Sequence, residues 1–201
     1  MELQIVRRLF GLQILIDLKR APKMKNLTLA CTLALSLVSL SALARQGPKI
    51  GQTAPEFIGH DWRNSQPLTL SELKGKVVVV HFWTLGCINC KHNLPSYNAW
   101  EKEFSKEGVV IVGIHTPESD YERSSRNLDQ AIQERKITYP VLVDNGGKNW
   151  NAWRQEYWPA VYLVDKQGRI RDSWQGELDF ENAGGTAKFT AEIKELLTEK
   201  S

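Results

Sequence analysis

The feature that most constrains the fold is a run of β-branched and aromatic residues, VVVVHFW, from Val77 to Trp83. Such a run is typical of a strand that is buried on both faces of a sheet. A helical stretch follows from Cys87 to about Glu107, with Trp100 and Phe104 at helical spacing. A doubly buried strand that leads into a helix predicts an α/β fold.

The rest of the chain continues this alternation of strands and helices, without an internal repeat. We therefore expect a mixed central β-sheet flanked by helices. Pro95 lies inside the first helix, where its missing N–H predicts a kink. The other expected elements are an extended lead-in over residues 45–58, a short strand and a turn within 66–76, a buried strand at 108–116, a helix at 127–135, a short strand within 138–147, a short helix at 148–158, a hairpin at 159–176 and a helix at 186–199.

Residues 24–44 have the pattern of a secretory signal peptide. Lys23 and Lys25 provide a basic start, Leu27 to Leu43 an apolar stretch, and Ala42-Leu43-Ala44 a cleavage site. The pattern predicts export to the periplasm. The alternative is an uncleaved membrane anchor, although five Ser or Thr residues make this stretch weakly apolar for a span.

Residues 1–23 precede this pattern and have two interpretations. They are either an extension from a start codon placed too early or a long basic n-region that stays in the cytoplasm. Residues 1–44 are therefore treated as a leader, and residues 45–201 are predicted to form a single domain. Cys31 lies in the leader, so the exported domain carries Cys87 and Cys90 as its cysteines.

The charge of the predicted domain is balanced, with 20 Lys and Arg residues against 21 Asp and Glu residues in 45–201. The isoelectric point of about 8.7 for the whole chain reflects the basic leader. The charge therefore gives no indication of a nucleic-acid partner.

Cys87-Ile88-Asn89-Cys90 admits four interpretations. A covalent haem site requires C-x-x-C-H, and Lys91 occupies the position of the histidine. A structural disulfide across so short a loop constrains the unfolded chain little. A zinc site needs further ligands, and a redox pair needs only the two thiols. The histidines available as metal ligands are at spacings that fit no standard zinc finger; they are His60, His81, His92 and His115.

A redox pair has a positive physical mechanism at this position. The first cysteine after a buried strand lies at the N-terminus of the following helix, where free N–H groups and the helix dipole stabilise a thiolate. Cys87 is then the nucleophile, and Cys90, one turn further, resolves the mixed disulfide. The redox-active disulfide itself serves the reaction, and we expect no other cofactor and no metal.

The stretch VVVVHFWTLGCINCKHNLP resembles the active site of thioredoxin-fold proteins, and EYWPAVYLVDKQGRI resembles the segment of that fold that carries its cis-proline. The resemblance implies a thioredoxin fold with an N-terminal β extension. It places Pro159 opposite the cysteine pair, where the neighbouring backbone pairs with an extended substrate. Trp83, Trp158 and Pro159 are the substrate-binding residues that it implies.

Five motifs in this order narrow the resemblance to periplasmic TlpA-like thioredoxins, and in particular to the domain that ends DipZ-type proteins: FWTLGCINC, VGIHTPE, ITYPVLVDN, YWPAVYLVD and GRIRDSWQGE. Together they cover residues 51–177. The resemblance implies an exported thiol–disulfide oxidoreductase of cell redox homeostasis. Because this chain shows no electron-feeding membrane domain, a reducing role implies a separate membrane partner.

His81 departs from the pattern of thioredoxins, which have a buried aspartate six residues before the first cysteine. An imidazole could accept the proton of the resolving thiol, and as a cation it would make the disulfide more oxidising. The alternative is a neutral, hydrogen-bonded histidine without a catalytic role. His115 could line the mouth of the site, whereas Glu118 and Asp120 are expected to cap a helix.

The sequence favours a monomeric oxidoreductase that exchanges thiols with cysteines of exported proteins, with reduction favoured over oxidation. Two alternatives use the same cysteines. A redoxin-type thiol peroxidase requires P-x-x-x-T/S-x-x-C, and the residues before Cys87 do not supply this motif. A non-enzymatic copper or zinc chaperone would use both cysteines and a histidine.

Overall fold

Strand β2 (Val77–Trp83) is the centre of the fold, and all seven of its residues are buried. The computed structural model describes residues 47–200, so the predictions for the leader, residues 1–44, lie outside the described part. The other elements are β1 (Trp62–Arg63), α2 (Ile88–Phe104), η3 (Ser105–Glu107), β3 (Val109–His115), α3 (Asp120–Arg123), α4 (Ser125–Glu134), β4 (Val141–Val143), α5 (Lys148–Ala152), β5 (Ala160–Val164), β6 (Ile170–Gln175), η4 (Phe180–Asn182) and α6 (Gly185–Thr198).

The six strands form one mixed sheet in the order β1-β4-β3-β2-β5-β6. Strands β2, β3 and β4 are parallel, whereas β1, β5 and β6 run antiparallel to their neighbours. The predicted mixed α/β sheet of a thioredoxin fold is confirmed. The N-terminal β extension consists of the short edge strand β1 and one bridge between Thr53 and Arg169.

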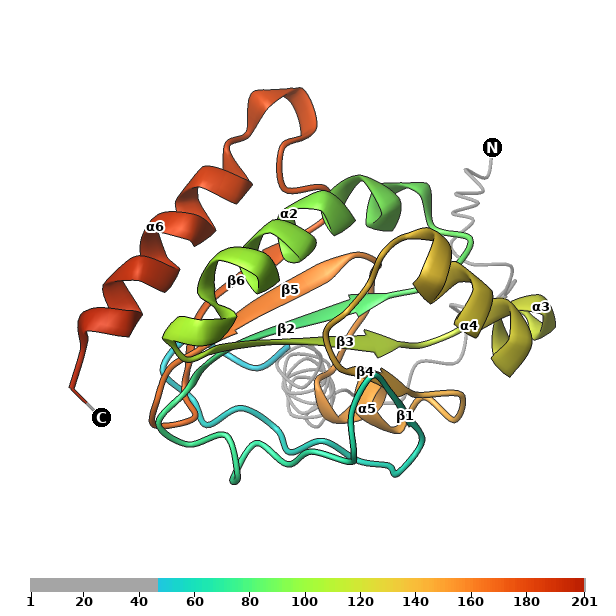
Figure 1. Ribbon diagram of the computed structural model, residues 1–201, viewed down its shortest axis with the longest axis horizontal. Coiled ribbons are helices and arrows are strands. Elements are labelled where there is room, and N and C mark those ends of the chain that lie inside the picture. Colours follow the sequence, from blue (N-terminus) through green and yellow to red (C-terminus); the bar gives the residue numbers. More distant parts are fainter. Residues whose placement is uncertain (1–46, 201) are drawn as a thin grey trace, which may run out of the picture. The chain divides into compact units, whose positions relative to one another are not determined.

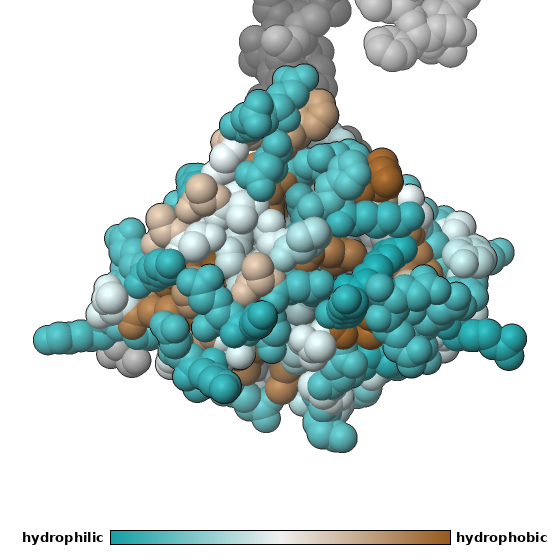
Figure 2. Space-filling view, turned by 45° about the horizontal axis from the view of Figure 1, so that its top comes forward, coloured by the Kyte–Doolittle hydropathy of each residue, from teal (hydrophilic) through white to brown (hydrophobic). Residues whose placement is uncertain are grey.

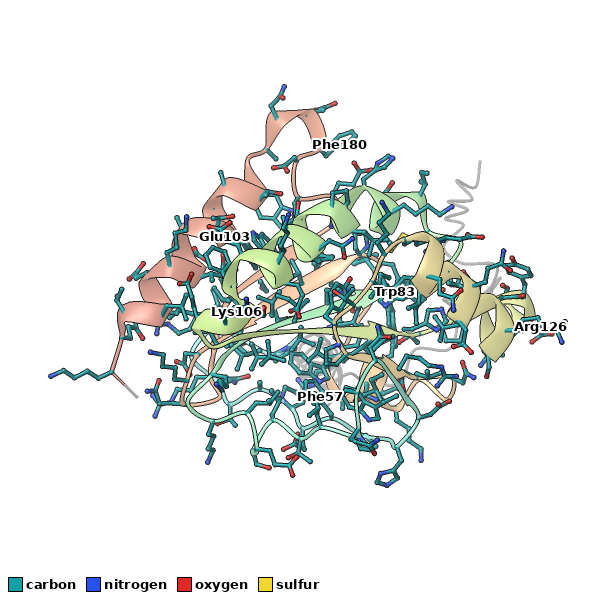
Figure 3. The ribbon with its side chains drawn as sticks, viewed as in Figure 1. Phe57, Trp83, Glu103, Lys106, Arg126 and Phe180 are labelled. Carbon is teal, nitrogen blue, oxygen red and sulfur yellow. A yellow bond between two sulfur atoms is a disulfide. The ribbon has the colours of Figure 1, made fainter. Side chains whose placement is uncertain are left out.

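Helices cover the two faces of the sheet differently. Helices α2 and α6 lie on one face, and α5 and the described segment before β2, residues 47–76, lie on the other (Figure 1). Alternate residues of β2 point to opposite faces, so Val79 and Trp83 belong to the core under α2, whereas Val80 and Phe82 pack toward Phe57 and α5. Figure 3 shows Trp83 and Phe57 on these opposite sides.

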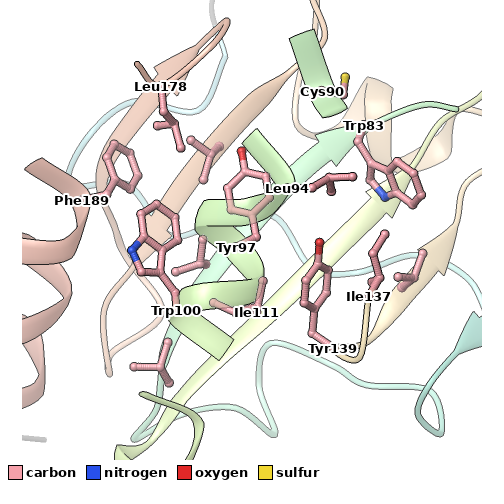
Figure 4. Packing of buried hydrophobic residues seen from close by; sticks show 14 of the residues in the cluster. Trp83, Cys90, Leu94, Tyr97, Trp100, Ile111, Ile137, Tyr139, Leu178 and Phe189 are labelled. Carbon is pink, nitrogen blue, oxygen red and sulfur yellow. The ribbon is translucent and has the colours of Figure 1, made fainter. Parts of the chain in front are cut away.

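The core under α2 reaches the cysteine pair. Tyr97 and Trp100 of α2 pack between the sheet and Phe189 of α6, and Cys90 lies at the end of this cluster (Figure 4). Burying an aromatic side chain of this kind contributes about 1.5–3 kcal/mol. The packing of α2 against the sheet therefore fixes the position of Cys90.

Two local predictions were wrong. The short strand expected within residues 66–76 is a series of turns over 70–75. Thr69 and Glu72 cause this, because each backbone N–H donates to the side chain of the other, as in a capping box. The cap of α3 is Ser119 rather than Glu118 or Asp120.

Helix α2 continues through Pro95 and does not end there. Among residues 47–200, the helices are too short or too polar to cross a lipid bilayer.

Candidate active site

Cys87 and Cys90 form a disulfide at the start of α2, with their Cα atoms 5.2 Å apart. Cys87 is the N-cap of the helix, and the N–H of Cys90 donates to its sulfur at 3.1 Å. The first turn carries no acidic residue. When the disulfide is reduced, the helix N-terminus and this N–H group favour the thiolate form of Cys87.

The two sulfurs differ in their access to solvent. Cys87 is partly exposed and lines a cleft, whereas Cys90 is 1% exposed and belongs to the core. An incoming disulfide therefore reaches Cys87 first. This difference in exposure is the one that separate roles of nucleophile for Cys87 and resolving thiol for Cys90 would require.

The cleft around Cys87 has a volume of about 450 Å³. Its remaining wall comes from the start of α2, the loop after β3 and the loop before β5, and consists of Ile88, Asn89, Glu118, Glu156, Tyr157 and Trp158.

The Trp158–Pro159 peptide bond is cis, as the resemblance implied. Pro159 directly precedes β5, whose register pairs Ala160 with Phe82, so Pro159 lies beside Trp83 at the end of β2. Trp158 lines the cleft and packs against Trp150, with ring centroids 4.0 Å apart and the ring planes tilted by 30°. The structure thus brings Trp158 and Pro159 to the end of the sheet that carries the cysteines.

Trp83 is buried completely and lies in the core cluster against which Cys87 packs. Its ring contacts His115 edge to face at 5.2 Å. Trp83 can therefore influence a substrate only through the residues that cover it.

His81 is also inaccessible to solvent. Its Nε2 lies 3.1 Å from the Tyr139 hydroxyl, and its ring stacks on Tyr97 with centroids 4.0 Å apart. Burial lowers the pKa of His81 to about 3. No hydrogen bond joins His81 to either cysteine among the residues described. This geometry favours the neutral, hydrogen-bonded alternative over the cationic one.

Gly113 of β3 lies opposite His81 of β2, and its missing side chain leaves room for the rings of His81 and Trp83. A Cβ atom at Gly113 would lie 2.9 Å from Nε2 of His81 and 3.1 Å from Nε1 of Trp83. A glycine within an otherwise β-branched strand, VVIVGIH, is the sequence signal for this close approach.

The sequence analysis missed Glu122, which is 3% exposed. Its carboxylate accepts hydrogen bonds from the N–H groups of Gly86 at 2.5 Å, Glu118 at 2.7 Å and Ser119 at 3.0 Å. Burial raises the pKa of Glu122, but these hydrogen bonds outweigh it, so the net pKa is lowered. Glu122 thus joins the loop before Cys87 to the loop that carries Glu118. Its spacing from Ser119, S-x-x-E, was the available signal.

Arg135 was also missed, and it contacts the same loop. Its guanidinium donates to the carbonyl of Leu85 at 2.9 Å and lies 5.6 Å from the centre of the Trp83 ring. His115, expected at the mouth of the site, is instead fully buried next to these groups. The pKa of His115 is lowered to about 4, mainly by burial; Glu122 opposes this shift and Arg135 adds to it.

Asn93 connects α2 to the segment after β6. The side chain, 2% exposed, donates to the carbonyl of Gly176 at 3.0 Å and accepts from the N–H of Leu178 at 2.8 Å. The N–H of Gly176 in turn donates to the carbonyl of Pro159 at 2.8 Å. These bonds link the helix that carries the cysteines to the cis-proline. No motif in the sequence indicated this link.

Within residues 47–200, no group of three or more His, Cys, Asp or Glu side chains is arranged to hold a metal ion.

Comparisons with known proteins agree with this geometry. The AhpC/TSA family matches residues 50–173. Protein DipZ of Mycobacterium tuberculosis is 36% identical over 132 residues, which are 64% of this chain and 19% of DipZ. The solution structure of a thioredoxin-like protein in the oxidised form is 28% identical, with a TM-score of 0.65 over 76% of this chain and 99% of that one.

The thiol-disulfide oxidoreductase YkuV of Bacillus subtilis is 31% identical over 125 residues, which are 61% of this chain and 83% of YkuV. The predicted resemblance to thioredoxin-like and DipZ-type proteins is thereby confirmed. The chain belongs to the AhpC/TSA family, and it shares its thioredoxin-like domain with thiol–disulfide oxidoreductases such as YkuV.

Proposed function

We propose that the protein is exported to the periplasm, where it reduces disulfides of other exported proteins. The observation that carries the chemistry is the contrast between the partly exposed Cys87 at the N-terminus of α2 and the buried Cys90. Export rests on the signal-peptide pattern of residues 24–44.

The reaction needs only the two thiols. The Cys87 thiolate attacks one sulfur of the substrate disulfide, and the other substrate sulfur leaves as a thiolate and takes up a proton. The Cys90 thiol then gives up its proton and attacks the sulfur of Cys87, which releases the second substrate sulfur as a thiolate. Two electrons have passed to the substrate, and Cys87–Cys90 is a disulfide again.

A dithiol donor must restore the reduced pair after each turnover. For an exported reductant, a thiol-reducing membrane protein is the fitting partner, and the substrates are cysteine-containing exported proteins. We propose that the enzyme acts as a monomer, without a bound cofactor.

An insulin-reduction assay with dithiothreitol tests the activity. We expect turnover that is lost in Cys87→Ser, and a mixed disulfide with the substrate that accumulates in Cys90→Ser. Equal turnover in Cys87→Ser would refute the mechanism. A parallel assay with hydrogen peroxide and the same thiol distinguishes the peroxidase alternative.

The measured reduction potential tests the direction of electron flow. A value near that of thioredoxin, about −270 mV, is expected for a reductant, whereas about −120 mV, as in DsbA, indicates an oxidant. Fractionation of cells that produce the full chain tests export: the mature protein should be in the periplasm and begin near Arg45. A protein that stays in the cytoplasm would contradict this part of the proposal.

A further inference from the structure

Exposed apolar side chains gather around Cys87. Ile88 and Tyr157, 58% and 59% exposed, line its cleft, and Phe180, 59% exposed, lines an adjoining depression of about 360 Å³. Asn89 lines both, so the two depressions are neighbours, and together they are termed the groove. In Figure 3, Phe180 projects beyond α2. The face of the molecule in Figure 2 is mostly hydrophilic, with separate apolar patches. Clustered apolar side chains on such a surface indicate a binding site.

The backbone along one wall of the groove is available for pairing. The N–H and C=O groups of Glu156, Tyr157 and Trp158 make no backbone hydrogen bond with any residue in the range 47–200. An extended segment of another chain can pair with such free groups. The groove is therefore suited to an extended polypeptide rather than to a folded surface.

The charge of the cleft is negative. Glu118 and Glu156 come from two different loops, are both exposed, and form no ion pair within the described part of the chain. No Lys, Arg or His lines this cleft. Two basic residues lie near in the sequence but do not line the cleft: Lys91 lines another depression, and Nδ1 of His92 lies 3.0 Å from a carboxylate oxygen of Glu177. A positive charge on a bound chain would meet two unpaired carboxylates here.

Building on the proposed function, we infer that the groove recognises an extended segment of a disulfide-containing polypeptide with a Lys or Arg beside the cysteine that Cys87 attacks. The carboxylates of Glu118 and Glu156 attract the cationic side chain, and Ile88 and Tyr157 contact its aliphatic part. The substrate class is thus basic and unfolded around its cysteine.

Three peptides that each contain one intramolecular disulfide test this inference. They differ only in the residue beside the attacked cysteine, which is Lys, Gln or Glu. We expect the reduced enzyme to react about tenfold faster with the Lys peptide than with the Glu peptide at low salt, and the ratio to shrink in 0.5 M NaCl.

The double variant Glu118→Gln/Glu156→Gln should bring the Lys-to-Glu ratio close to one. Any effect of the two lost charges on the reactivity of Cys87 itself is the same for all three peptides and cancels in the ratio. Glu103→Gln/Glu107→Gln, at the other end of α2, removes the same charge and should leave the ratio unchanged.

The Gln peptide separates the two proposals. If wild-type enzyme reduces the Gln peptide but shows equal rates for the Lys and Glu peptides, the recognition of cationic segments is wrong and the oxidoreductase function stands. If the ratio survives in Glu118→Gln/Glu156→Gln, the assignment to these carboxylates is wrong. If no peptide is reduced, the proposed function fails, and this inference fails with it.

Discussion

Glu122 and Arg135 hold the two ends of one peptide unit, the one between Leu85 and Gly86. The carboxylate accepts the N–H of Gly86, and the guanidinium donates to the carbonyl of Leu85. This peptide lies one residue before Cys87. The opposite charges of the two side chains match the dipole of the peptide group, so the clamp fixes the orientation of the active-site loop.

Removing the carboxylate should therefore destabilise the domain and slow its reaction. Glu122→Ala leaves three backbone N–H groups without their acceptor, and we expect a loss of about 3 kcal/mol in the free energy of unfolding. Because Cys87 also loses its fixed position, the rate of insulin reduction should fall on the order of tenfold. Urea unfolding and the insulin assay measure the two effects.

Glu122→Gln keeps one acceptor oxygen, so its loss of stability should be smaller than that of Glu122→Ala. Glu107→Ala changes an exposed glutamate of η3, which follows α2; it is the control and should change neither quantity. Because the folded state lowers the pKa of Glu122, its contribution is present above the unfolded value of about 4.5 and is lost as the pH falls through the lowered value. Wild type and Glu122→Gln should therefore converge in stability in acid.

Gly86→Ala tests the same contact from the other side. A Cβ atom at Gly86 would lie 2.9 Å from Oε1 of Glu122 and force the two loops apart. We expect a loss of about 1–3 kcal/mol, typical of overpacking, and a slower reaction of Cys87 with a disulfide reagent. Gly146→Ala, where a Cβ meets nothing within 4 Å, is the matched control. Equal stability of the two variants would show that the contact can relax.

The two buried histidines should make the domain sensitive to moderate acid. His81 and His115 have pKa values lowered to about 3 and 4, so the unfolded chain binds protons below about pH 6.5 that the folded chain does not. Stability is thus full above pH 6.5 and falls with the pH, by about 2 kcal/mol per histidine at pH 5. Urea unfolding of the oxidised protein at pH 8, 6 and 5 measures this loss.

A His115→Gln variant should lose about half of this pH dependence. An unchanged slope in that variant would mean that His115 is protonated in the folded protein.

His81→Asn separates the two roles considered for this residue. Because His81 is neutral near pH 7, its replacement should leave the thiol pKa of Cys87 and the reduction potential unchanged, while stability falls through the lost stacking on Tyr97. His81→Asp does not separate these roles, because it places a new ionisable carboxyl group in the buried site. A shift of the potential in His81→Asn toward more reducing values would restore the cationic role.

The sequence predicted the sheet, the cysteine pair at the start of α2 and the cis-proline segment because each rests on a local pattern. A β-branched run and a C-x-x-C at a strand-to-helix junction are visible without tertiary structure, and the cis-proline was implied by the resemblance of EYWPAVYLVDKQGRI to a segment of the thioredoxin fold. The prediction of a short strand within residues 66–76 was wrong. The backbone N–H groups of Thr69 and Glu72 donate to each other's side chains and are not available for pairing with another strand.

The contacts behind the active site could not be predicted in the same way. Glu122 reads as a capping residue of a short helix, and its bond to Gly86 joins loops that are 36 positions apart in the chain. Asn93 and Leu178 are separated by 85 positions. Such pairs depend on how the helices pack against the sheet, and local sequence patterns do not specify that packing.

The hydrogen bonds from Asn93 through Gly176 to Pro159 have a consequence for how this protein can change over evolutionary time. They connect helix α2, which carries Cys90, to Pro159 just before β5, whereas Glu118, Glu156 and Tyr157 take no part in these hydrogen bonds and lie on the rim of the cleft. Substitutions at the rim can therefore change which substrates bind, while the arrangement of Cys87, Cys90 and Pro159 stays the same.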